Sequence, residues 1–245
     1  MAQKQFQLVL QAARMITPRV RELTFVREDR SPLDYTPGQF ITLFIESGGE
    51  RLRRSYSIAS IPGSESEEIR IAATYVEGGR ATARLFKIEP GERIQAMGPF
   101  GRLVLREDPP GRYLLVATGT GVTPYRAMLP ELERRIDLEG FHVELLLGVR
   151  GPEELIYGDE FTAFASQCNA FTFRACYSRE QPERAGEFEH SGYVQGILPN
   201  MALNPERDIV YLCGNPTMID EATAFLTENG FSMRNVRREK YVSSN

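Results

Sequence analysis

The chain has 245 residues, enough for one large domain or two modest ones, each with its own hydrophobic core. Its hydrophobic fraction of 42% and charged fraction of 25% are those of a globular protein. A formal net charge of −4 gives nucleic-acid binding no global electrostatic support, and no apolar run approaches the roughly 20 residues that span a membrane. Because the first residues lead into no apolar stretch of the signal-peptide type, we expect a cytoplasmic protein that binds neither nucleic acid nor membrane.

Cysteine and histidine are too few for several classes of site. The three cysteines, Cys168, Cys176 and Cys213, are scattered without C-x-x-C spacing, and the histidines are His142 and His190. We therefore expect no disulfide framework and no metal site, and an iron–sulfur cluster would need about four thiolates. The chemistry must come from bound organic cofactors or from carboxylates and hydroxyls.

Residues 5–105 show the pattern of an antiparallel β-barrel or sandwich. Apolar and polar positions alternate over short stretches, which predicts strands at 5–9, 39–44, 56–58 and 69–72. Turn dipeptides rich in glycine and proline separate these stretches, and a short helix is expected at 81–87. Short strands between regular turns are typical of antiparallel barrels.

Beyond this region the pattern changes. Pro109-Pro110-Gly111 is the best linker candidate, since proline restricts the chain and glycine interrupts regular structure. Apolar runs follow at 113–117, 143–147, 171–176 and 209–213, and they alternate with segments compatible with helices, the first from Pro124 to Ile136. This alternation predicts a parallel sheet covered on both faces, with ligands bound at the carboxyl ends of its strands. We place the domains at 1–108 and 109–245.

Two strings in the first half have groups suited to a nucleotide cofactor. In Arg54-Ser55-Tyr56-Ser57, an arginine can neutralise a pyrophosphate, a tyrosine ring can stack on a flat heterocycle, and a serine hydroxyl can reach a ring nitrogen. In Gly78-Gly79-Arg80-Ala81-Thr82, glycines let backbone amides approach a phosphate at the start of a helix. An exposed strand and a plain hairpin turn are the alternative interpretations.

Three strings in the second half each follow an apolar run. Gly119-Thr120-Gly121-Val122-Thr123-Pro124 can cradle a nucleotide at a helix N-terminus, although its proline departs from the three-glycine dinucleotide fingerprint. Ser178-Arg179 sets a hydroxyl beside a guanidinium, which suits a phosphate dianion. Cys213-Gly214-Asn215-Pro216 ends the fourth run, and neither histidine lies in a motif that would make its thiol catalytic. An ordinary turn, a polar loop and a buried small thiol are the respective alternatives.

Together and in this order, these strings resemble the ferredoxin–NADP reductase family, whose members pass electrons between NADPH and a one-electron carrier through FAD. The resemblance covers roughly residues 5 to 241. It implies two domains. The N-terminal one is an antiparallel β-barrel of the Greek-key type that binds FAD, and the C-terminal one is an α/β domain with a parallel sheet that binds NADP(H).

The resemblance assigns the flavin site to the N-terminal half. Tyr56 would lie against the isoalloxazine, Ser57 would approach the flavin N5, and Arg54 would contact the pyrophosphate. The full set of expected FAD-binding residues is Arg54, Ser55, Tyr56, Ser57, the stretch Ala72, Ala73 and Thr74 whose backbone would follow the ring, and Arg80, Ala81 and Thr82 at the pyrophosphate.

The resemblance assigns the nicotinamide nucleotide to the C-terminal half. Ser178 and Arg179 would bind the 2′-phosphate, which implies a preference for NADPH over NADH. The other expected contacts are Arg150 at a phosphate, Tyr193 stacked on adenine, Thr120 at the nicotinamide and the flavin edge, Cys213 and Gly214 as a wall beside the nicotinamide, and Met218 near the nucleotide.

The tail from residue 237 to residue 245 is expected to form a last strand and a loose end. Family members end in or near an aromatic residue that covers the flavin, and Tyr241 matches it. Glu239 matches a carboxylate near the flavin that can supply a proton. Ser57, Cys213, Glu239 and Tyr241 are thus the expected catalytic residues. Residues 242–245 either contact the FAD adenine or form a free end.

Ferredoxin, flavodoxin or both are the partners that the resemblance implies. Arginines cluster within 51–54 and 234–238, where they would attract acidic carriers despite the negative net charge, although solvated surface is the plain alternative. Two other functions stay open. One is an NADPH-dependent reductase of free flavin or the reductase component of an oxygenase, and the other is a subunit that holds FAD without catalytic turnover.

Overall fold

The computed structural model describes residues 5–63 and 67–241, which fall into two compact units. Unit 1 comprises the described residues up to Leu105 together with Thr123–Pro130, and unit 2 comprises Arg106–Val122 and the described residues from Glu131 onward. The division after Leu105 precedes the expected one between 108 and 109, because Asp108 already accepts hydrogen bonds from Arg237 of unit 2. Among the described helices, none combines the length and the apolar character that crossing a membrane requires.

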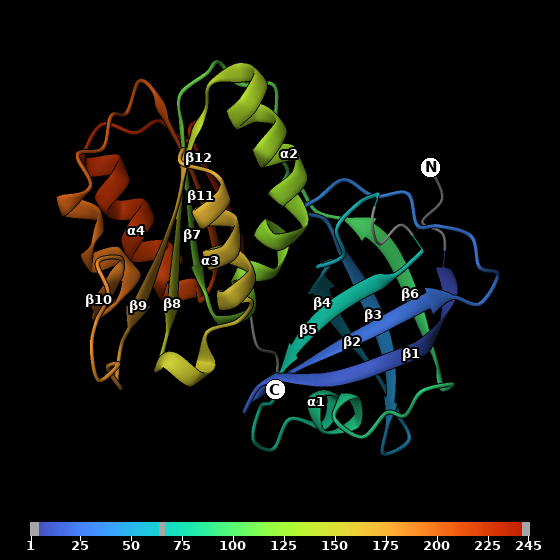
Figure 1. Cartoon of the computed structure of the whole chain (residues 1–245). Coiled ribbons are helices and arrows are strands. Elements are labelled where there is room, and N and C mark those ends of the chain that lie inside the picture. Colours follow the sequence, from blue (N-terminus) through green and yellow to red (C-terminus); the bar gives the residue numbers. More distant parts are fainter. Residues whose placement is uncertain (1–4, 64–66, 242–245) are drawn as a thin grey trace. The chain divides into compact units, whose positions relative to one another are not determined.

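Unit 1 is a six-stranded antiparallel sheet with one short helix (Figure 1). Its elements are β1 (Gln5–Thr17), β2 (Val20–Arg27), β3 (Phe40–Ser47), β4 (Glu50–Ser57), β5 (Ile69–Thr74), α1 (Arg80–Leu85) and β6 (Arg93–Phe100). The strand order is β4-β3-β6-β1-β2-β5. Ala59, two residues after the end of β4, donates its N–H to the Arg70 carbonyl of β5 at 2.7 Å, so the chain leaving one edge strand reaches the other and the sheet curls into a half-barrel. This confirms the predicted antiparallel barrel.

The inside of the half-barrel is the core of unit 1. Successive strand residues face opposite sides of a sheet, so alternate residues of each strand point inward. The buried inward residues include Leu8, Leu10, Leu23, Phe25, Ile41, Leu43, Ile69 and Ile71, with Leu85 and Ile88 at the end of α1. This core holds β4, β5 and α1, which contain the expected flavin-binding residues, on a packed scaffold.

Several predicted elements of unit 1 had wrong bounds. β1 continues to Thr17 instead of ending at residue 9, and register shifts next to Leu10 and Met15 break the alternation that would have revealed its length. β4 begins at Glu50 instead of residue 56, and α1 covers Arg80–Leu85 instead of 81–87. β2 was missed. It contains Glu22, a buried carboxylate paired with Arg14 at 2.8 Å, which obscures the apolar pattern.

Unit 2 is built on a six-stranded parallel sheet, as predicted. Its strands are β7 (Arg112–Thr118), β8 (His142–Val149), β9 (Phe171–Tyr177), β10 (Glu189–Ser191), β11 (Asp208–Gly214) and β12 (Val236–Lys240), in the order β10-β9-β8-β7-β11-β12. Its helices are η1 (Gly119–Val122), η2 (Pro152–Glu154), α3 (Gly158–Gln167), η3 (Val194–Gly196), η4 (Leu198–Asn200) and α4 (Pro216–Glu228). The last residues of α2 (Thr123–Glu139) also belong to it.

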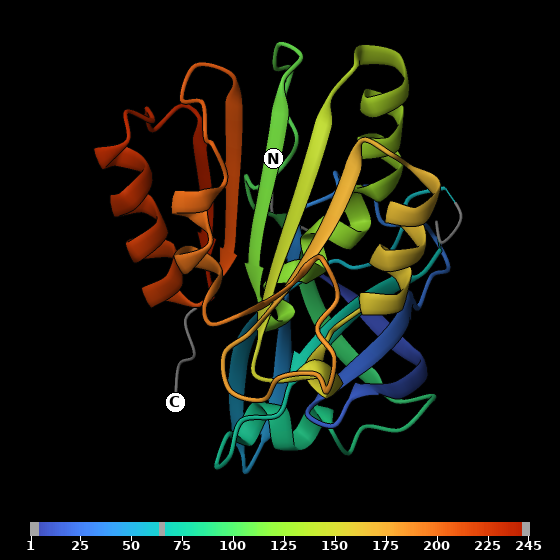
Figure 2. The same cartoon turned by 60° about the vertical axis from the view of Figure 1, so that its left-hand side comes forward.

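Helices cover both faces of this sheet. Figure 2 shows α3 and α4 on opposite sides of it. Ile219, Ala222 and Leu226 of α4 pack into one core with Val116 and Leu212 of the strands. On the other face, the rings of Phe161 and Phe173 lie 5.4 Å apart. α2 runs to Glu139, beyond the predicted end at Ile136, and stops at Gly140, which has φ 72°.

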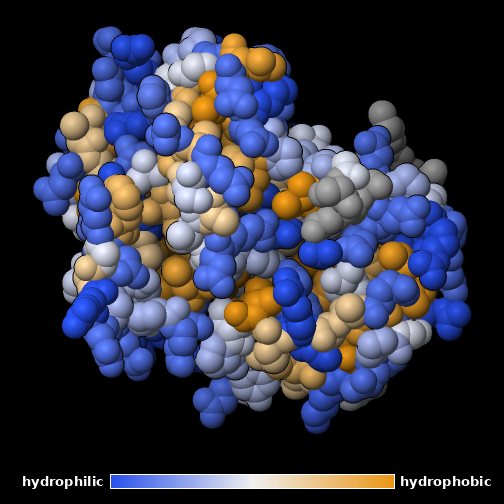
Figure 3. All heavy atoms as spheres, in the orientation of Figure 1, coloured by the Kyte–Doolittle hydropathy of each residue, from blue (hydrophilic) through white to orange (hydrophobic). Residues whose placement is uncertain are grey.

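The side of the molecule drawn in Figure 3 is mainly hydrophilic on both units, with hydrophobic residues in small groups. Large hydrophobic side chains that are exposed include Met15, Tyr75, Leu138, Phe188, Tyr193 and Met233. Single exposed hydrophobic residues are normal on protein surfaces. Exposure is therefore informative only where other observations point to the same residue, as they do for Tyr193.

Candidate functional site

The carboxyl edge of the parallel sheet gathers the residues expected to bind the nicotinamide nucleotide. Strands β7 to β10 follow one another in one direction and β11 and β12 lie on the other side of β7, so the strand order reverses between β7 and β11. Ligands bind outside the carboxyl ends of strands at such a point. The expected residues at this edge are Thr120 after β7, Arg150 after β8, Ser178 and Arg179 after β9, Tyr193 after β10, Cys213 and Gly214 at the end of β11, and Tyr241 after β12.

The turns after β7 and β11 pack against each other without room for side chains. A Cβ atom at Gly121 would overlap the carbonyl oxygen of Cys213. A Cβ atom at Gly214 would lie 2.5 Å from Thr118 Oγ1, and Gly214 has φ +126°, which L residues with side chains rarely adopt. Both glycines are therefore required by the structure, and the two strings form one interlocked surface at the point where the strand order reverses.

Arg150 and Arg179 form a positive site on neighbouring strand ends. The Arg150 carbonyl accepts hydrogen bonds of 2.9 Å from the N–H groups of Arg179 and Glu180, which ties the two turns together. The Ser178 hydroxyl donates to the Val149 carbonyl at 3.2 Å. Both arginine side chains are exposed, and within residues 5–63 and 67–241 neither forms an ion pair. Two free guanidinium groups beside a hydroxyl suit a phosphate dianion.

Tyr193 and Met218 differ in what they offer a nucleotide. Tyr193 follows β10, and its side chain is 66% exposed, so the ring is available for stacking. Met218 is buried in the core beneath α4, so its side chain packs inside unit 2. Only its backbone N–H, which donates to the Asn215 side chain at 3.4 Å, faces the turn.

Cys213, Glu239 and Tyr241 come together at the end of β11 and β12. Cys213 lies opposite Glu239 in the parallel pairing, and the Tyr241 N–H donates to the Gly214 carbonyl at 2.8 Å. Complete burial raises the pKa of the Cys213 thiol well above its usual value, and the Glu239 carboxylate raises this pKa further. A hydrogen bond with the Tyr241 side chain opposes the rise. Cys213 is thus a neutral thiol that contributes shape and not nucleophilicity.

Cys213 is accordingly expected to resist alkylation at pH 8, because only the thiolate reacts and the buried thiol stays protonated. Cys168, which is only partly buried, serves as the internal comparison. Mass spectrometry of peptides after timed exposure to iodoacetamide should show Cys168 modified first and Cys213 unmodified in the folded protein. Equal rates at the two positions would contradict a buried neutral thiol.

In unit 1 the expected flavin-binding string lies on the edge strand β4. The Tyr56 ring packs against the barrel core, and burial raises the pKa of its hydroxyl to about 12, against the opposing charge of Arg54. Ser57 is buried. The Arg54 guanidinium donates to the Arg53 carbonyl at 2.9 Å, and the exposed Ser55 hydroxyl lies 3.0 Å from Thr42 Oγ1. The string therefore presents a fixed ring, a guanidinium and two hydroxyls.

The second expected flavin-binding region joins β5 to α1. Ala72 and Ala73 are buried small residues on β5, which Thr74 ends. The Thr82 hydroxyl donates to the Gly79 carbonyl at 3.1 Å and braces the turn before the helix. The buried side chain of Ala81 leaves only backbone to a ligand, and the Arg80 guanidinium is paired with Glu50 at 2.5 Å.

These groups fit FAD by their chemistry. Tyr56 supplies an aromatic ring, Arg54 a cation, Ser55 and Ser57 hydroxyls, and the first turn of α1 the backbone N–H groups that a helix start leaves free. The aromatic ring and the hydroxyls suit the ring system of the cofactor, and the cation and the backbone N–H groups suit its pyrophosphate.

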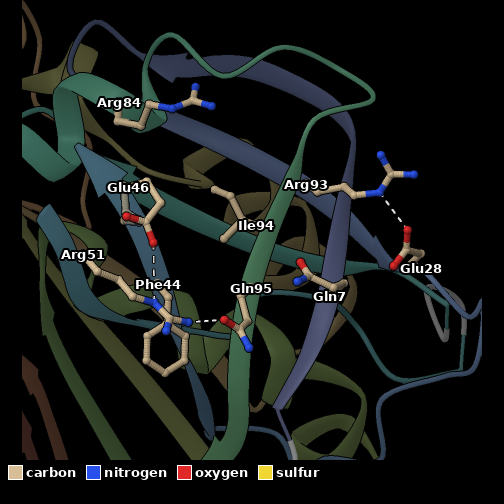
Figure 4. Close-up of a pocket in the computed structure, with 10 residues that line it drawn as sticks. Gln7, Glu28, Phe44, Glu46, Arg51, Arg84, Arg93, Ile94 and Gln95 are labelled. Atoms are coloured by element: carbon tan, nitrogen blue, oxygen red, sulfur yellow. Dashed lines mark hydrogen bonds and ion pairs between the residues drawn. The ribbon is translucent and has the colours of Figure 1, made fainter. Parts of the chain in front are cut away.

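A separate pocket of about 400 Å³ in unit 1 contains none of the expected site residues (Figure 4). It is lined by Gln7, Glu28, Phe44, Ile45, Glu46, Arg51, Arg84, Arg93, Ile94 and Gln95. Its cations are compensated: Arg93 pairs with Glu28 at 2.7 Å, and Arg51 lies 3.6 Å from Glu46 with its guanidinium over the Phe44 ring. The lining carboxylates offset much of the positive charge of these arginines, and none of the residues expected to bind the flavin is among the lining residues.

One residue of the C-terminal arginine cluster was misinterpreted from the sequence. Arg237 is only 7% exposed, and its guanidinium donates to both carboxylate oxygens of Asp108 and to the Tyr211 hydroxyl. It therefore cannot attract a carrier at the surface. Arg234 and Arg238 are exposed, as expected.

Comparison with known proteins agrees with this geometry. An oxidoreductase FAD-binding domain model matches residues 7–105, and an oxidoreductase NAD-binding domain model matches residues 115–224. The chain is 34% identical over 246 residues to ferredoxin–NADP reductase B of Sorangium cellulosum, covering 96% of this chain and 97% of that protein. It is 27% identical over 240 residues to the electron transfer component of toluate 1,2-dioxygenase from Pseudomonas putida, covering 98% and 68%.

The fold is also that of a solved structure, the ferredoxin NADP+ reductase from Neisseria gonorrhoeae with bound FAD and NADP. The two agree with a TM-score of 0.82 at 24% identity over 97% of this chain and 98% of the other. The two domain models and the relative from Sorangium cellulosum confirm the resemblance inferred from the motifs. The chain belongs to the ferredoxin–NADP reductase family of flavoprotein oxidoreductases, with an N-terminal FAD-binding domain and a C-terminal domain for a nicotinamide nucleotide.

Proposed function

We propose that the protein is a ferredoxin–NADP(+) reductase that transfers electrons between NADPH and ferredoxin or flavodoxin through FAD. The observation that supports this choice of nucleotide is the pair of guanidinium groups of Arg150 and Arg179 beside Ser178, which form no ion pair with the part of the chain that the structure describes. These groups suit the 2′-phosphate that distinguishes NADPH from NADH. When bound, FAD would supply the redox chemistry, which is hydride exchange with the nucleotide and single-electron exchange with the carrier.

The protein's own part is to bind and orient these groups. In unit 1, Tyr56 would lie against the isoalloxazine and Ser57 would approach N5. The backbone of Ala72, Ala73 and Thr74 would follow the ring, and Arg54, Arg80, Ala81 and Thr82 would hold the pyrophosphate. In unit 2, Arg150, Ser178 and Arg179 would bind the 2′-phosphate end, and Tyr193 would stack on adenine. Thr120, Cys213 and Gly214 would surround the nicotinamide end, with the backbone of Met218 near the nucleotide. Glu239 would supply a proton, and Tyr241 would cover the flavin. The expected role of residues 242–245 lies outside the described residues.

The carrier is the least constrained part of the proposal. The relative from Sorangium cellulosum is named a ferredoxin–NADP reductase, which supports ferredoxin, and the similarity to the toluate dioxygenase component supports an oxygenase reductase as the second candidate. We place the protein in the cytoplasm, where NADPH and small acidic carriers are available.

Steady-state turnover of the FAD-loaded protein tests this function. NADPH should drive the reduction of ferredoxin, which is monitored through the coupled reduction of cytochrome c. NADH should be a poor electron donor in the same assay. Faster reduction of added riboflavin than of any carrier would identify a free-flavin reductase. Reduction of an oxygenase's own carrier but not of ferredoxin or flavodoxin would identify an oxygenase reductase. No NADPH oxidation with ferricyanide as acceptor would leave only a subunit that holds FAD.

Tyr241→Ser is expected to tighten NADP+ binding by up to about tenfold, because stacking of the ring on the flavin, worth about 0.5–1.5 kcal/mol, would no longer compete with the nicotinamide. Spectral titration of the oxidised protein measures this affinity directly. Tyr241→Phe is the matched control, since it keeps the ring and removes only the hydroxyl, and should bind NADP+ as the wild type does. Unchanged affinity in the serine variant would show that Tyr241 only ends its strand.

A further inference from the structure

Thr118, the last residue of β7, joins both neighbouring strands through one side chain. Its hydroxyl accepts a hydrogen bond of 2.9 Å from the N–H of Asn215, directly after β11. Its methyl group lies over Gly148 of β8, where an added Cβ atom would be 3.3 Å from Thr118 Cγ2. Since β7 lies between β8 and β11, Thr118 connects three strands at the edge where the nucleotide residues gather.

The space around Thr118 is defined by glycines on both sides. At Gly214, an added Cβ atom would lie 2.5 Å from Thr118 Oγ1 and 2.7 Å from the Thr118 carbonyl oxygen. At Gly148, an added Cβ atom would lie 2.9 Å from Val194 Cγ1 as well as close to the threonine methyl. A side chain that branches at Cβ into one hydroxyl and one methyl therefore matches both neighbours at once.

The hydroxyl of Thr118 also fixes the turn that begins α4. The Asn215 side-chain oxygen accepts hydrogen bonds from the N–H groups of Thr217 at 2.8 Å and Met218 at 3.4 Å, which makes Asn215 the N-cap of the helix. Thr118 holds the backbone of this capping residue, and Gly214 and Cys213 immediately precede it. A change in the Thr118 hydroxyl is thus transmitted to the whole turn from Cys213 to Asn215.

We propose that Thr118 is a positioning residue for the nicotinamide half of the nucleotide, acting through its hydroxyl on the turn from Cys213 to Asn215. This inference rests on the proposed function, because that turn and Thr120 are the proposed nicotinamide contacts. The proposed phosphate contacts Arg150 and Arg179 are linked to each other by their own backbone hydrogen bond and make no use of the hydroxyl. Thr118 therefore affects one half of the nucleotide and not the other.

Thr118→Val and Thr118→Ser separate the two contacts. Valine has nearly the same shape and replaces the hydroxyl by a methyl group, whereas serine keeps the hydroxyl and removes the methyl group. Calorimetric titration of the FAD-loaded variants uses NADP+ and adenosine 2′,5′-bisphosphate, which lacks the nicotinamide half. Thr118→Val should raise the Kd for NADP+ about threefold to tenfold, which is equivalent to about 0.7–1.4 kcal/mol of binding free energy. The same variant should change the Kd for the bisphosphate by less than about twofold. Thr118→Ser should bind both as the wild type does.

The ratio of the two affinities distinguishes positioning from a general structural effect. Three outcomes would each overturn the inference. Thr118→Val could lose affinity for both ligands equally, it could bind NADP+ as the wild type does, or Thr118→Ser could bind NADP+ as weakly as Thr118→Val. If circular dichroism shows that valine prevents folding, Thr118→Ala is titrated with the same expectation. A wild-type protein that binds neither ligand would overturn the proposed function itself, whatever Thr118 does.

Discussion

Arg179→Ala is expected to raise the KM for NADPH by about tenfold to one hundredfold and to leave the KM for NADH nearly unchanged. A charge-assisted hydrogen bond is worth about 1.5–3 kcal/mol, and about 1.4 kcal/mol corresponds to a factor of ten. Arg179 is exposed and forms no ion pair within the described parts of the chain, so its removal leaves no buried charge behind. The loss should therefore appear in recognition of the 2′-phosphate and not in stability.

Arg207→Ala is the matched control for this prediction. Arg207 is also exposed, but it directly precedes β11 and so lies at the amino edge of the same sheet, away from the strand ends that hold Ser178 and Arg150. It should alter neither KM. Initial rates with each nucleotide at a fixed concentration of ferricyanide give the two KM values of the wild type and of each variant. An equal rise in both KM values for Arg179→Ala would show that this arginine does not recognise the 2′-phosphate.

The gathering of the expected nucleotide-binding residues at one edge of the sheet could be predicted because it follows from topology. The four inner strands of unit 2, which are β7, β8, β9 and β11, are largely buried, so each contains an apolar run in the sequence. The run at 209–213, for example, lies within the observed strand Asp208–Gly214. In a parallel sheet all carboxyl ends share one edge. Residues that directly follow the runs, such as Thr120 and Ser178, therefore had to gather there.

Contacts between residues distant in the sequence could not be predicted in this way. Asp108 and Arg237 lie in the linker region and in the last strand, and no local pattern relates them. Arg237 consequently looked like one more surface cation. Thr118 was missed for a similar reason: it ends an apolar run, and its importance depends on Asn215 and Gly148, which reach it only after the sheet has formed.

The buried pair of Asp108 and Arg237 leads to the prediction with the largest effect on stability. Asp108→Ala is expected to lower the free energy of unfolding by about 3–5 kcal/mol, because it leaves the Arg237 guanidinium buried without its counter-ion. The side chains of Asp108 and Arg237 are only 11% and 7% exposed. The Tyr113 hydroxyl, which donates to Asp108 at 3.2 Å, loses its acceptor as well.

Asp220→Ala provides the comparison, since it removes the partner of another cation on the same strand. Asp220 pairs with Lys240 at 2.6 Å, but the two side chains are 59% and 38% exposed, so the loss should stay below about 1 kcal/mol. Urea unfolding followed by circular dichroism measures both variants. Replacing Arg237 by Met in the Asp108→Ala background should recover part of the lost stability, because the unpaired charge is then gone. If Asp108→Ala lowers the free energy of unfolding no more than Asp220→Ala does, water must reach Arg237. Burial would then not determine the strength of the pair of Asp108 and Arg237.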